Sequence, residues 1–264
     1  MPASQPKRPF LSIVTIMRNA HEGFRRTADS VGASKPNWCE WIVIDGGSTD
    51  GTLESVASYR PSMQYFVSEP DKGIADAFNK GIARAKGDYV LFLNAGDEIL
   101  PDTYDRLGPI LSDPRKAPAI VGQIRMNGRY FGHPVKFWRQ FGRNYLPHQA
   151  MLIRRSLFRL LGNYDVSRRL GMDYEWSLRL KSRWSDILFV SFPISEMEPG
   201  GTSMTNYEQT FASYHQARVK HCPRYQGLSK VLEMFFVLKA NTGRVVRRSV
   251  KQVRGGLTSA HKGG

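Results

Sequence analysis

The segment WIVIDGGSTDGT, residues 41–52, constrains the fold more strongly than any other part of this chain. A short apolar run ends in an acidic, glycine-rich turn, which continues directly into a stretch with helical character. In a parallel sheet, such turns lie at the carboxyl ends of the strands, where open α/β folds bind ligands. Asp45 is predicted at the strand tip, beside Gly46 and Gly47, which let the backbone approach a ligand closely. The alternative is a plain strand-to-helix loop in which the Ser48 hydroxyl caps the helix.

Apolar strands and amphipathic helices alternate through the first half of the chain. Buried strands are predicted at residues 10–17, 41–45, 63–68 and 88–94. Between the last two strands, apolar residues recur with the period of a helix at Ile74, Ala77, Phe78, Gly81, Ile82 and Ala85. This alternation predicts a mostly parallel sheet with right-handed crossovers. The predicted fold class is therefore α/β, Rossmann-like, with helices flanking a central sheet.

The pattern changes after about residue 115. Two strands, at residues 119–126 and 128–132, are predicted around a hairpin turn at Asn127-Gly128. Helices are predicted at residues 156–161 and 173–183, and a strand at residues 187–195. We therefore expect one α/β domain over residues 1–205 and a basic helical extension over residues 206–264, of which roughly the last ten residues are expected to be disordered.

The positive charge of the chain lies entirely in its second half. Residues 1–120 carry 14 Lys/Arg and 15 Asp/Glu, whereas residues 121–264 carry 24 and 8, so the net charges are −1 and +16. A basic half predicts an anionic partner, which is a nucleic acid, a set of phosphate groups or an acidic membrane surface.

The termini and cysteines bear on the cellular compartment. The N-terminal residues MPASQPKRP lack the character of a secretory signal, and no apolar run approaches the roughly 18 residues of a membrane span. Cys39 and Cys222 lie far apart without metal-type spacing, which indicates free thiols in a reducing compartment. A cytoplasmic location is expected.

A second acidic turn follows the strand predicted at residues 88–94. Asn94, Asp97 and Glu98 come directly at or after its end. Two parallel strands that end in carboxylates form a cleft suited to Mg²⁺ or Mn²⁺, which favour carboxylate oxygens and share them with substrate phosphates. For Asp97, the alternative is a turn residue that binds its own backbone.

With both turns in view, the sequence resembles the family-2 glycosyltransferases, which have the GT-A fold, over roughly residues 10–200. The resemblance rests on five blocks in the family's order, SIVTIMRN (12–19), IDGGSTDGT (44–52), DKGIADAFNKG (71–81), GDYVLFLNAGD (87–97) and GMDYEWSLRL (171–180). It implies a nucleotide-sugar donor, a divalent cation and a single catalytic carboxylate.

The resemblance implies positions for the donor. Thr15 and Arg18 would lie beside the nucleotide, and Asp45 would accept hydrogen bonds from its base, which is typically uracil. The ribose and phosphates would be bordered by Lys72, Asp76 and Asn79. For Asp76, the solvated face of a helix is an equal alternative.

Asn94, Ala95, Gly96 and Asp97 occupy the place of the family's metal motif, which is often Asp-x-Asp-Asp. Two carboxylates are therefore missing, and Asp97 is the predicted ligand of Mn²⁺ or Mg²⁺. Members of this subtype often carry His-Gln where this chain has His148-Gln149, which implies that His148 contacts the diphosphate or the metal. A structural histidine is the alternative.

Asp173 matches the family's catalytic carboxylate. An inverting transferase needs one base, opposite the leaving group, that deprotonates the acceptor hydroxyl as the new bond forms. The alternative is an aspartate that only favours the dipole at the start of its helix.

Two basic segments bear on the acceptor. Arginines, lysines and aromatic residues are interleaved over residues 125–145, a mixture that suits a sugar or phosphate-bearing acceptor, although an ordinary surface loop would read similarly. In residues 227–254 an apolar helix precedes a basic one, which favours an anionic membrane surface and a lipid-linked acceptor. A helix packed on the domain is the alternative.

These observations predict an inverting, metal-assisted transferase. It would move a sugar from a nucleotide diphosphate, typically a UDP-sugar, to a glycan or lipid-linked acceptor in surface polysaccharide biosynthesis. A degenerate nucleotide-sugar-binding protein is one alternative, because carboxylates are missing around Asn94. A basic nucleic-acid-binding protein is another, but it leaves the acidic strand tips unexplained. A nucleotidyltransferase would need a glycine-rich, basic loop after the first strand, and residues 17–20 are not one. The oligomeric state is not indicated.

Overall fold

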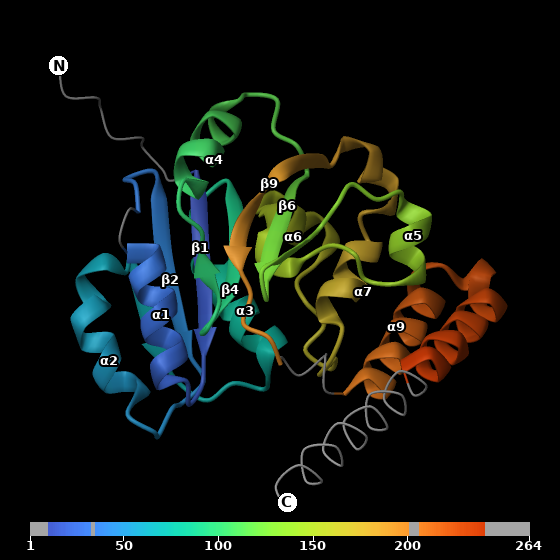
Figure 1. The fold of residues 1–264 in the computed structure, drawn as a ribbon, viewed down its shortest axis with the longest axis horizontal. Coiled ribbons are helices and arrows are strands. Elements are labelled where there is room, and N and C mark those ends of the chain that lie inside the picture. The colour runs from blue at the N-terminus through green and yellow to red at the C-terminus, as the bar shows by residue number, and fades with distance from the viewer. Residues whose placement is uncertain (1–9, 33–34, 201–205, 241–264) are drawn as a thin grey trace, which may run out of the picture. The chain divides into compact units, whose positions relative to one another are not determined.

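The computed structural model describes residues 10–32, 35–200 and 206–240. The chain divides into two compact units, with the boundary between residues 201 and 202. In the described part of the first unit, nine strands form one sheet in the order β3-β2-β1-β4-β8-β6-β9-β5, with β7 paired to β6 (Figure 1). The strands are β1 (Leu11–Met17), β2 (Cys39–Asp45), β3 (Tyr65–Ser68), β4 (Tyr89–Asn94), β5 (Glu98–Ile99), β6 (Ala119–Met126), β7 (Arg129–Phe131), β8 (Met151–Arg154) and β9 (Leu188–Glu196).

The first four strands form the parallel part of the sheet. β1 pairs in parallel with β2 and β4, and β2 pairs in parallel with β3. Every residue of β1 and β2 is buried, as expected for strands covered by helices on both faces. The connections contain α1 (His21–Gly32), α2 (Thr52–Tyr59) and α3 (Ile74–Arg84). The four strands predicted for this half are confirmed, with ends shifted by at most two residues.

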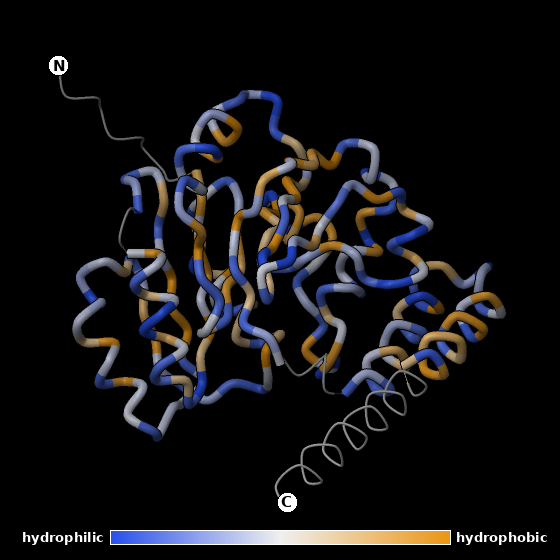
Figure 2. The backbone as a smooth tube through the Cα atoms, viewed as in Figure 1, coloured by the Kyte–Doolittle hydropathy of each residue, from blue (hydrophilic) through white to orange (hydrophobic). Residues whose placement is uncertain are grey.

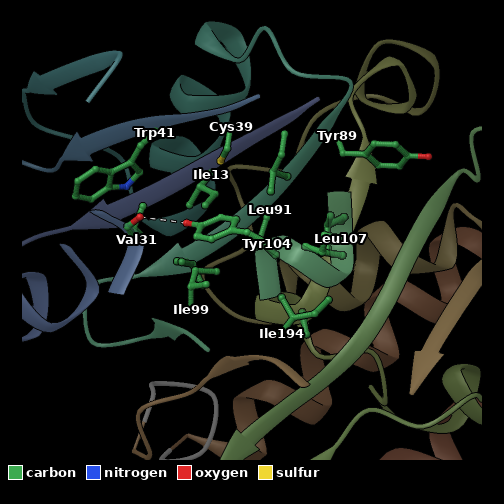
Figure 3. Packing of buried hydrophobic residues seen from close by; sticks show 14 of the residues in the cluster. Ile13, Val31, Cys39, Trp41, Tyr89, Leu91, Ile99, Tyr104, Leu107 and Ile194 are labelled. Atoms are coloured by element: carbon green, nitrogen blue, oxygen red, sulfur yellow. Dashed lines mark hydrogen bonds between the residues drawn. The ribbon is translucent and has the colours of Figure 1, made fainter. Parts of the chain in front are cut away.

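Two apolar layers cover the sheet, because successive side chains of a strand point to opposite faces. Leu11 and Ile13 pack with residues of α1, α2 and α4 (Thr103–Ser112). Val14 and Ile16 pack with residues of α3, α6 (Ser156–Leu161) and α7 (Met172–Leu178). Figure 3 shows the first layer, in which the Tyr104 hydroxyl donates a hydrogen bond to the carbonyl of Val31 at 3.2 Å.

The second half of the sheet is mixed. β8, which was not predicted, runs antiparallel to both β4 and β6, whereas β9 runs parallel to β6. The predicted hairpin is confirmed: β6 and β7 are antiparallel, and Asn127 and Gly128 have φ values of 50° and 71°. Both values are positive, as a two-residue type I′ turn requires. The two cysteines are free, as expected, and both are buried.

Two expectations about helices need correction, and two helices, α4 and Phe137–Gly142, were not predicted. The helix predicted over residues 173–183 ends at Leu178, and a 3₁₀ helix, Lys181–Asp186, follows it. Ile74 is 42% exposed, and Ala75 takes its place on the buried face of α3. Ile74 is the first residue of that helix, so it extends past the layer that the following turns cover.

The second unit contains two described helices, α9 (Tyr207–His221) and a helix over residues 226–240, joined by a short 3₁₀ turn (Pro223–Tyr225). The Arg218 side chain is fully buried and donates hydrogen bonds to the hydroxyl and carbonyl of Ser229, at 2.7 and 3.2 Å. Phe211 stacks on Phe236 at 5.3 Å between ring centroids. None of the helices in the described ranges is long and apolar enough to cross a membrane. The tail expected to be disordered lies outside these ranges, as does the basic segment 241–254.

Candidate active site

The carboxyl ends of β1, β2 and β4 form one edge of the sheet. The register pairs Met17 with Asp45 across β1 and β2, and Ile16 with Asn94 across β1 and β4. Neighbouring strands lie about 4.8 Å apart, so the loops after these three strands begin within roughly 10 Å of one another. The sequence correctly predicted that these loops meet at one edge. The conformation of each loop decides which of its side chains are exposed at that edge.

Asp45 lies at the end of β2, but its side chain points inward. It is fully buried, and Oδ2 accepts hydrogen bonds from the amides of Gly47 and Ser48, at 3.1 and 2.9 Å, and from the Ser68 hydroxyl at 2.6 Å. Oδ1 accepts from the Ser48 hydroxyl at 2.5 Å. Asp45 therefore fixes the shape of the first acidic turn. Thr15 is also buried, and its hydroxyl accepts a hydrogen bond from the Trp41 indole at 3.0 Å.

Arg18 and Asp71 border the first turn on its open side. A Cβ atom on Gly46 would lie 2.2 Å from Asp71 Oδ2 and 3.5 Å from Arg18 Cβ, so both side chains approach this glycine. Arg18 is exposed, and its guanidinium forms no ion pair or hydrogen bond with any residue that the structure describes. The sequence did not single out Asp71, although it opens the third block of the family resemblance.

The residues predicted near ribose and phosphates differ in their surroundings. Asp76 Oδ2 accepts a hydrogen bond from the Lys72 amide at 3.0 Å and lies 3.9 Å from the Lys80 ammonium. The Lys72 side chain is exposed. The Asn79 amide binds both backbone groups of Tyr164, at 2.9 and 3.0 Å, and so joins α3 to the loop after α6. Of these residues, Lys72 has an exposed charged side chain that forms no ion pair or hydrogen bond in the described part of the chain.

Asp97 ends the second acidic turn and is only 3% exposed. Its Oδ2 accepts hydrogen bonds from the backbone and side-chain amides of Asn94, at 3.0 and 3.1 Å, and Oδ1 accepts from the Glu198 amide at 3.1 Å. Burial raises the pKa of Asp97 to about 6, although these amide donors act in the opposite direction. Asp45 and Asp97 thus each serve their own loop, and their carboxylates do not meet in an open cleft.

Gly96 leaves room for a carboxylate that the sequence did not assign. Its φ is +107°, and a Cβ atom there would lie only 2.1 Å from Glu198 Oε2. Glu198 follows β9 and is exposed, and its Oε1 accepts a hydrogen bond from Arg26 at 2.6 Å. Asn94 and Ala95, the first two residues of the predicted motif, are partly exposed beside it. A carboxylate from a distant segment therefore stands against the glycine of this motif.

This arrangement is compatible with a cation that arrives with a diphosphate. The described residues contain no group of three His, Cys, Asp or Glu side chains placed to hold a metal. However, Mg²⁺ sites often use only one or two carboxylates and complete their shell with waters and substrate phosphates. Asp97 accepts three hydrogen bonds from the amides of Asn94 and Glu198, and the Gln149 side chain also lowers its pKa. Asp97 and the exposed Glu198 are the carboxylates beside Gly96 that such a cation would use.

Asp173 is the second residue of α7 and is partly exposed. Its Oδ2 accepts a hydrogen bond from the Asn144 side-chain amide at 2.8 Å, whereas Oδ1 accepts none from the part of the chain that the structure describes. The negative charge of Asp173 contributes to raising the pKa of Tyr164, after the larger effect of burial. The Asn144 amide therefore fixes Oδ2 of Asp173, whereas Oδ1 is available to accept a hydrogen bond.

His148 lies beneath this carboxylate in an aromatic cluster. Its ring stacks on Phe92 at 4.9 Å between centroids, and Nε2 lies 2.8 Å from the Tyr164 hydroxyl. Burial lowers the pKa of His148, while the charge of Asp173 acts in the opposite direction. His148 is therefore buried among aromatic rings, close enough to Asp173 for that charge to act on its pKa.

Comparisons with known proteins agree with this fold. The family model described as Glycosyl transferase family 2 matches residues 12–161, more than half of the chain. An uncharacterized glycosyltransferase of Mycobacterium tuberculosis strain H37Rv is 36% identical over 186 residues, which cover 65% of this chain and 68% of that protein. A PGL/p-HBAD biosynthesis glycosyltransferase of Mycobacterium bovis strain BCG is 27% identical over 77% of this chain and 82% of its own length.

Solved structures share the fold at lower identity. TarS of S. aureus in complex with UDP-GlcNAc has a TM-score of 0.63 and 16% identity, over 86% of this chain and 71% of that one. The mannosyltransferase PcManGT of Pyrobaculum calidifontis, in complex with GDP-Man and Mn²⁺, has a TM-score of 0.62 and 17% identity, over 84% and 68% of the two chains. The sheet with its strand-edge loops thus defines a GT-A-like glycosyltransferase. This chain belongs to glycosyl transferase family 2.

Proposed function

We propose that this protein transfers a sugar from a nucleotide diphosphate, most simply a UDP-sugar, to a hydroxyl of a glycan or lipid-linked acceptor, with inversion at the sugar carbon. The observation that carries the proposal is the edge where three parallel strands end, with an open guanidinium at Arg18 and, at Asp173, a carboxylate with one open oxygen. The names of relatives, PGL/p-HBAD biosynthesis and teichuronic acid biosynthesis, support a surface glycan as the product.

The donor binds along the loops after β1, β2 and β3. The base lies against the turn at Gly46 and Gly47, whose shape Asp45 maintains, so Asp45 acts through the loop that it braces. Asp71 stands beside this turn as a hydrogen-bond acceptor. Arg18 and Lys72 supply positive charge to the diphosphate, because neither cation is neutralised by the described part of the chain.

Asp97 and Glu198 would hold Mn²⁺ or Mg²⁺ together with the donor diphosphate. When bound, the cation offsets the negative charge that develops on the leaving nucleotide diphosphate. The chain's own contribution is to keep Asp97 oriented through the amides of Asn94 and Glu198. Gly96 permits the approach of the Glu198 carboxylate, which a side chain at position 96 would displace.

Asp173 deprotonates the acceptor hydroxyl. Oδ1 receives the proton while the acceptor oxygen forms its bond to the sugar carbon, and the bond from that carbon to the diphosphate breaks. The Asn144 amide keeps Oδ2 occupied, so only one oxygen of the carboxylate meets the acceptor. His148 and Tyr164 support the wall beside Asp173.

The test measures nucleotide binding and turnover separately. Thermal shifts with UDP, GDP, ADP and CDP identify the base, since a ligand stabilises the state that it binds. Nucleotide release from UDP-glucose, UDP-galactose, UDP-GlcNAc and GDP-mannose then reports turnover, with water or an alkyl glucoside as acceptor. We expect Asp173→Asn to keep the thermal shift and to lose turnover by roughly a hundredfold or more.

Three outcomes would count against the proposal. Full turnover in Asp173→Asn would place the base elsewhere. The unaltered protein could bind a nucleotide and yet release none from any of these sugar donors. That result would favour a degenerate nucleotide-sugar-binding protein, an alternative suggested by the missing carboxylates at Asn94 and Gly96. The absence of any nucleotide response would remove the donor site.

We further propose that the second unit brings the enzyme to an anionic membrane surface at the cytoplasmic face, where a lipid-linked acceptor is available. The described helix over residues 226–240 exposes large apolar side chains, each more than half accessible: Leu228, Val231, Met234, Phe235 and Leu238. Figure 2 shows apolar residues along this helix. An apolar helix face with lysines and arginines nearby is suited to an interfacial position on anionic lipid.

A further inference from the structure

A chain of side-chain amides leads to Asp173 from the loop that precedes β8. Gln140 is fully buried in α5 (Phe137–Gly142), and its Oε1 accepts a hydrogen bond from the Tyr145 amide at 2.7 Å. A backbone N–H can only donate, so this contact fixes which end of the Gln140 side chain is the oxygen. The nitrogen must therefore point the other way.

That nitrogen makes two further contacts. Gln140 Nε2 donates to Asn144 Oδ1 at 2.8 Å and to the Ser177 hydroxyl oxygen at 2.8 Å. Because Oδ1 of Asn144 faces Gln140, its Nδ2 faces Asp173 and donates to Oδ2 at 2.8 Å. Each amide orientation thus follows from the one before it, beginning at a backbone group whose role is fixed.

We propose that Asn144, oriented by Gln140, is a positioning residue for the catalytic base. The inference rests on the proposed function, in which Asp173 deprotonates the acceptor. A donor on Oδ2 holds the plane of the carboxylate, so that Oδ1 faces the acceptor. The basic and aromatic segment, residues 125–145, which contains Gln140 and Asn144, therefore contributes to the chemical step as well as to the surface.

The same elements are joined by contacts that do not involve Asn144. The Tyr174 hydroxyl donates to the carbonyl of Phe141 at 2.6 Å, and the Ser177 hydroxyl donates to the carbonyl of Tyr174 at 2.7 Å. The bond from Tyr174 to Phe141 and the bond from Gln140 to Ser177 connect α5 to α7, whereas the bond from Ser177 to Tyr174 lies within α7. Removal of the Asn144 amide should therefore leave the helices in place and free only the carboxylate.

The first experiment compares Asn144→Ala with the unaltered full-length protein, using nucleotide release from the UDP-sugar or GDP-mannose that turns over fastest. We expect kcat to fall by roughly ten- to a hundredfold, since small errors in the position of a catalytic group cost about that much. The KM for the donor should stay within about twofold, because Asn144 makes no contact with the donor loops in the described structure. Asn163→Ala, which removes an exposed amide whose side chain makes no hydrogen bond in the described residues, is the matched control.

Two more variants separate positioning from a structural role. In an Asp173→Asn background, Asn144→Ala should change the residual turnover by less than about twofold, because the residue on which it acts is gone. Gln140→Glu keeps the shape of the side chain but removes the donor to Asn144 and to Ser177, so it should lower kcat at least as much as Asn144→Ala, although residue 140 does not touch Asp173. Thermal unfolding of each variant shows whether the fold is kept.

The outcomes distinguish this inference from the proposed function. An unchanged kcat in Asn144→Ala, with turnover lost in Asp173→Asn, would overturn the positioning role alone. Equal losses from Asn144→Ala in both backgrounds would show that the residue acts independently of Asp173, and would overturn it as well. Full turnover in Asp173→Asn, or none from the unaltered protein with every donor, would overturn the proposed function and the inference with it.

Discussion

At the scale of single residues, two separate reasons require glycine at position 96. Its φ of +107° lies in a region that favours glycine, and a Cβ atom would overlap the Glu198 carboxylate. Gly73 shares only the first requirement, since its φ is +118° and a Cβ atom there would meet nothing within 4 Å. The pair therefore separates backbone strain from the contact with Glu198.

We predict that Gly73→Ala lowers the free energy of unfolding by about 1 kcal/mol and Gly96→Ala by roughly 1.5–2 kcal/mol, since the exposed Glu198 carboxylate can move aside at a small cost. The excess should largely disappear when Gly96→Ala is combined with Glu198→Ala, because the displaced carboxylate is then absent. Urea unfolding curves measure each value. Equal losses for the two glycines, or an excess that persists without Glu198, would mean that the carboxylate does not stand against position 96 in solution.

The sequence predicted where the two strand-tip carboxylates lie along the chain, but it did not predict the direction in which their side chains point. Asp45 and Asp97 were correctly located at the ends of β2 and β4. Each side chain accepts hydrogen bonds from its own turn, and Ser68 of β3 and Glu198, after β9, each add a donor from a distant segment. The periodicity of a strand contains no information about such distant partners. Asn144 was missed for the same reason.

At the scale of elements, the sequence predicted those helices, strands and turns that depend on interactions between neighbouring residues. The hairpin at Asn127 and Gly128 needed only two residues that tolerate positive φ. β8 has only four residues, and its place between β4 and β6 depends on pairing with strands distant in sequence. α4 carries Pro109 in its interior, a residue that obscures a helical pattern.

The helix over residues 226–240 is the element whose exposed face calls for a test. We predict that the full-length protein sediments with phosphatidylglycerol vesicles, and that the triple variant Val231→Gln, Met234→Gln and Leu238→Gln lowers the vesicle-bound fraction at least tenfold. Each of these side chains is more than 60% exposed, and burial of such a side chain is worth roughly 1.5–3 kcal/mol.

Leu160→Gln is the matched control, because Leu160 is 61% exposed but belongs to the first unit. It should leave sedimentation unchanged. Phosphatidylcholine vesicles should bind the unaltered protein more weakly, since they lack the negative charge that attracts lysine and arginine. Equal sedimentation of the triple variant and the unaltered protein would assign membrane attachment, if any, to residues outside this helix.

At the scale of the whole molecule, the net charge of −1 in residues 1–120 and +16 in residues 121–264 separates two tasks. In the proposed function, the first half supplies the parallel strands and nearly all of the loops that would bind the donor, and its carboxylates shape those turns. The second half supplies Asp173, its supporting amides and the exposed helix of the second unit. Glu198 is an exception, because it belongs to the second half and completes the acidic turn of the first.

This division predicts how metal and nucleotide depend on each other. Since Asp97 and Glu198 are only two carboxylates, Mn²⁺ alone should raise the melting temperature by less than about 1 °C, whereas Mn²⁺ with the preferred nucleotide diphosphate should exceed the nucleotide alone by several degrees. Glu198→Gln and Asp97→Asn should each remove that increment and keep the response to nucleotide without metal. Glu208→Gln, in the second unit, is the control and should retain it. A large response to Mn²⁺ in the absence of nucleotide would indicate a preformed site with further ligands, and an undiminished increment in both carboxylate variants would place the cation elsewhere.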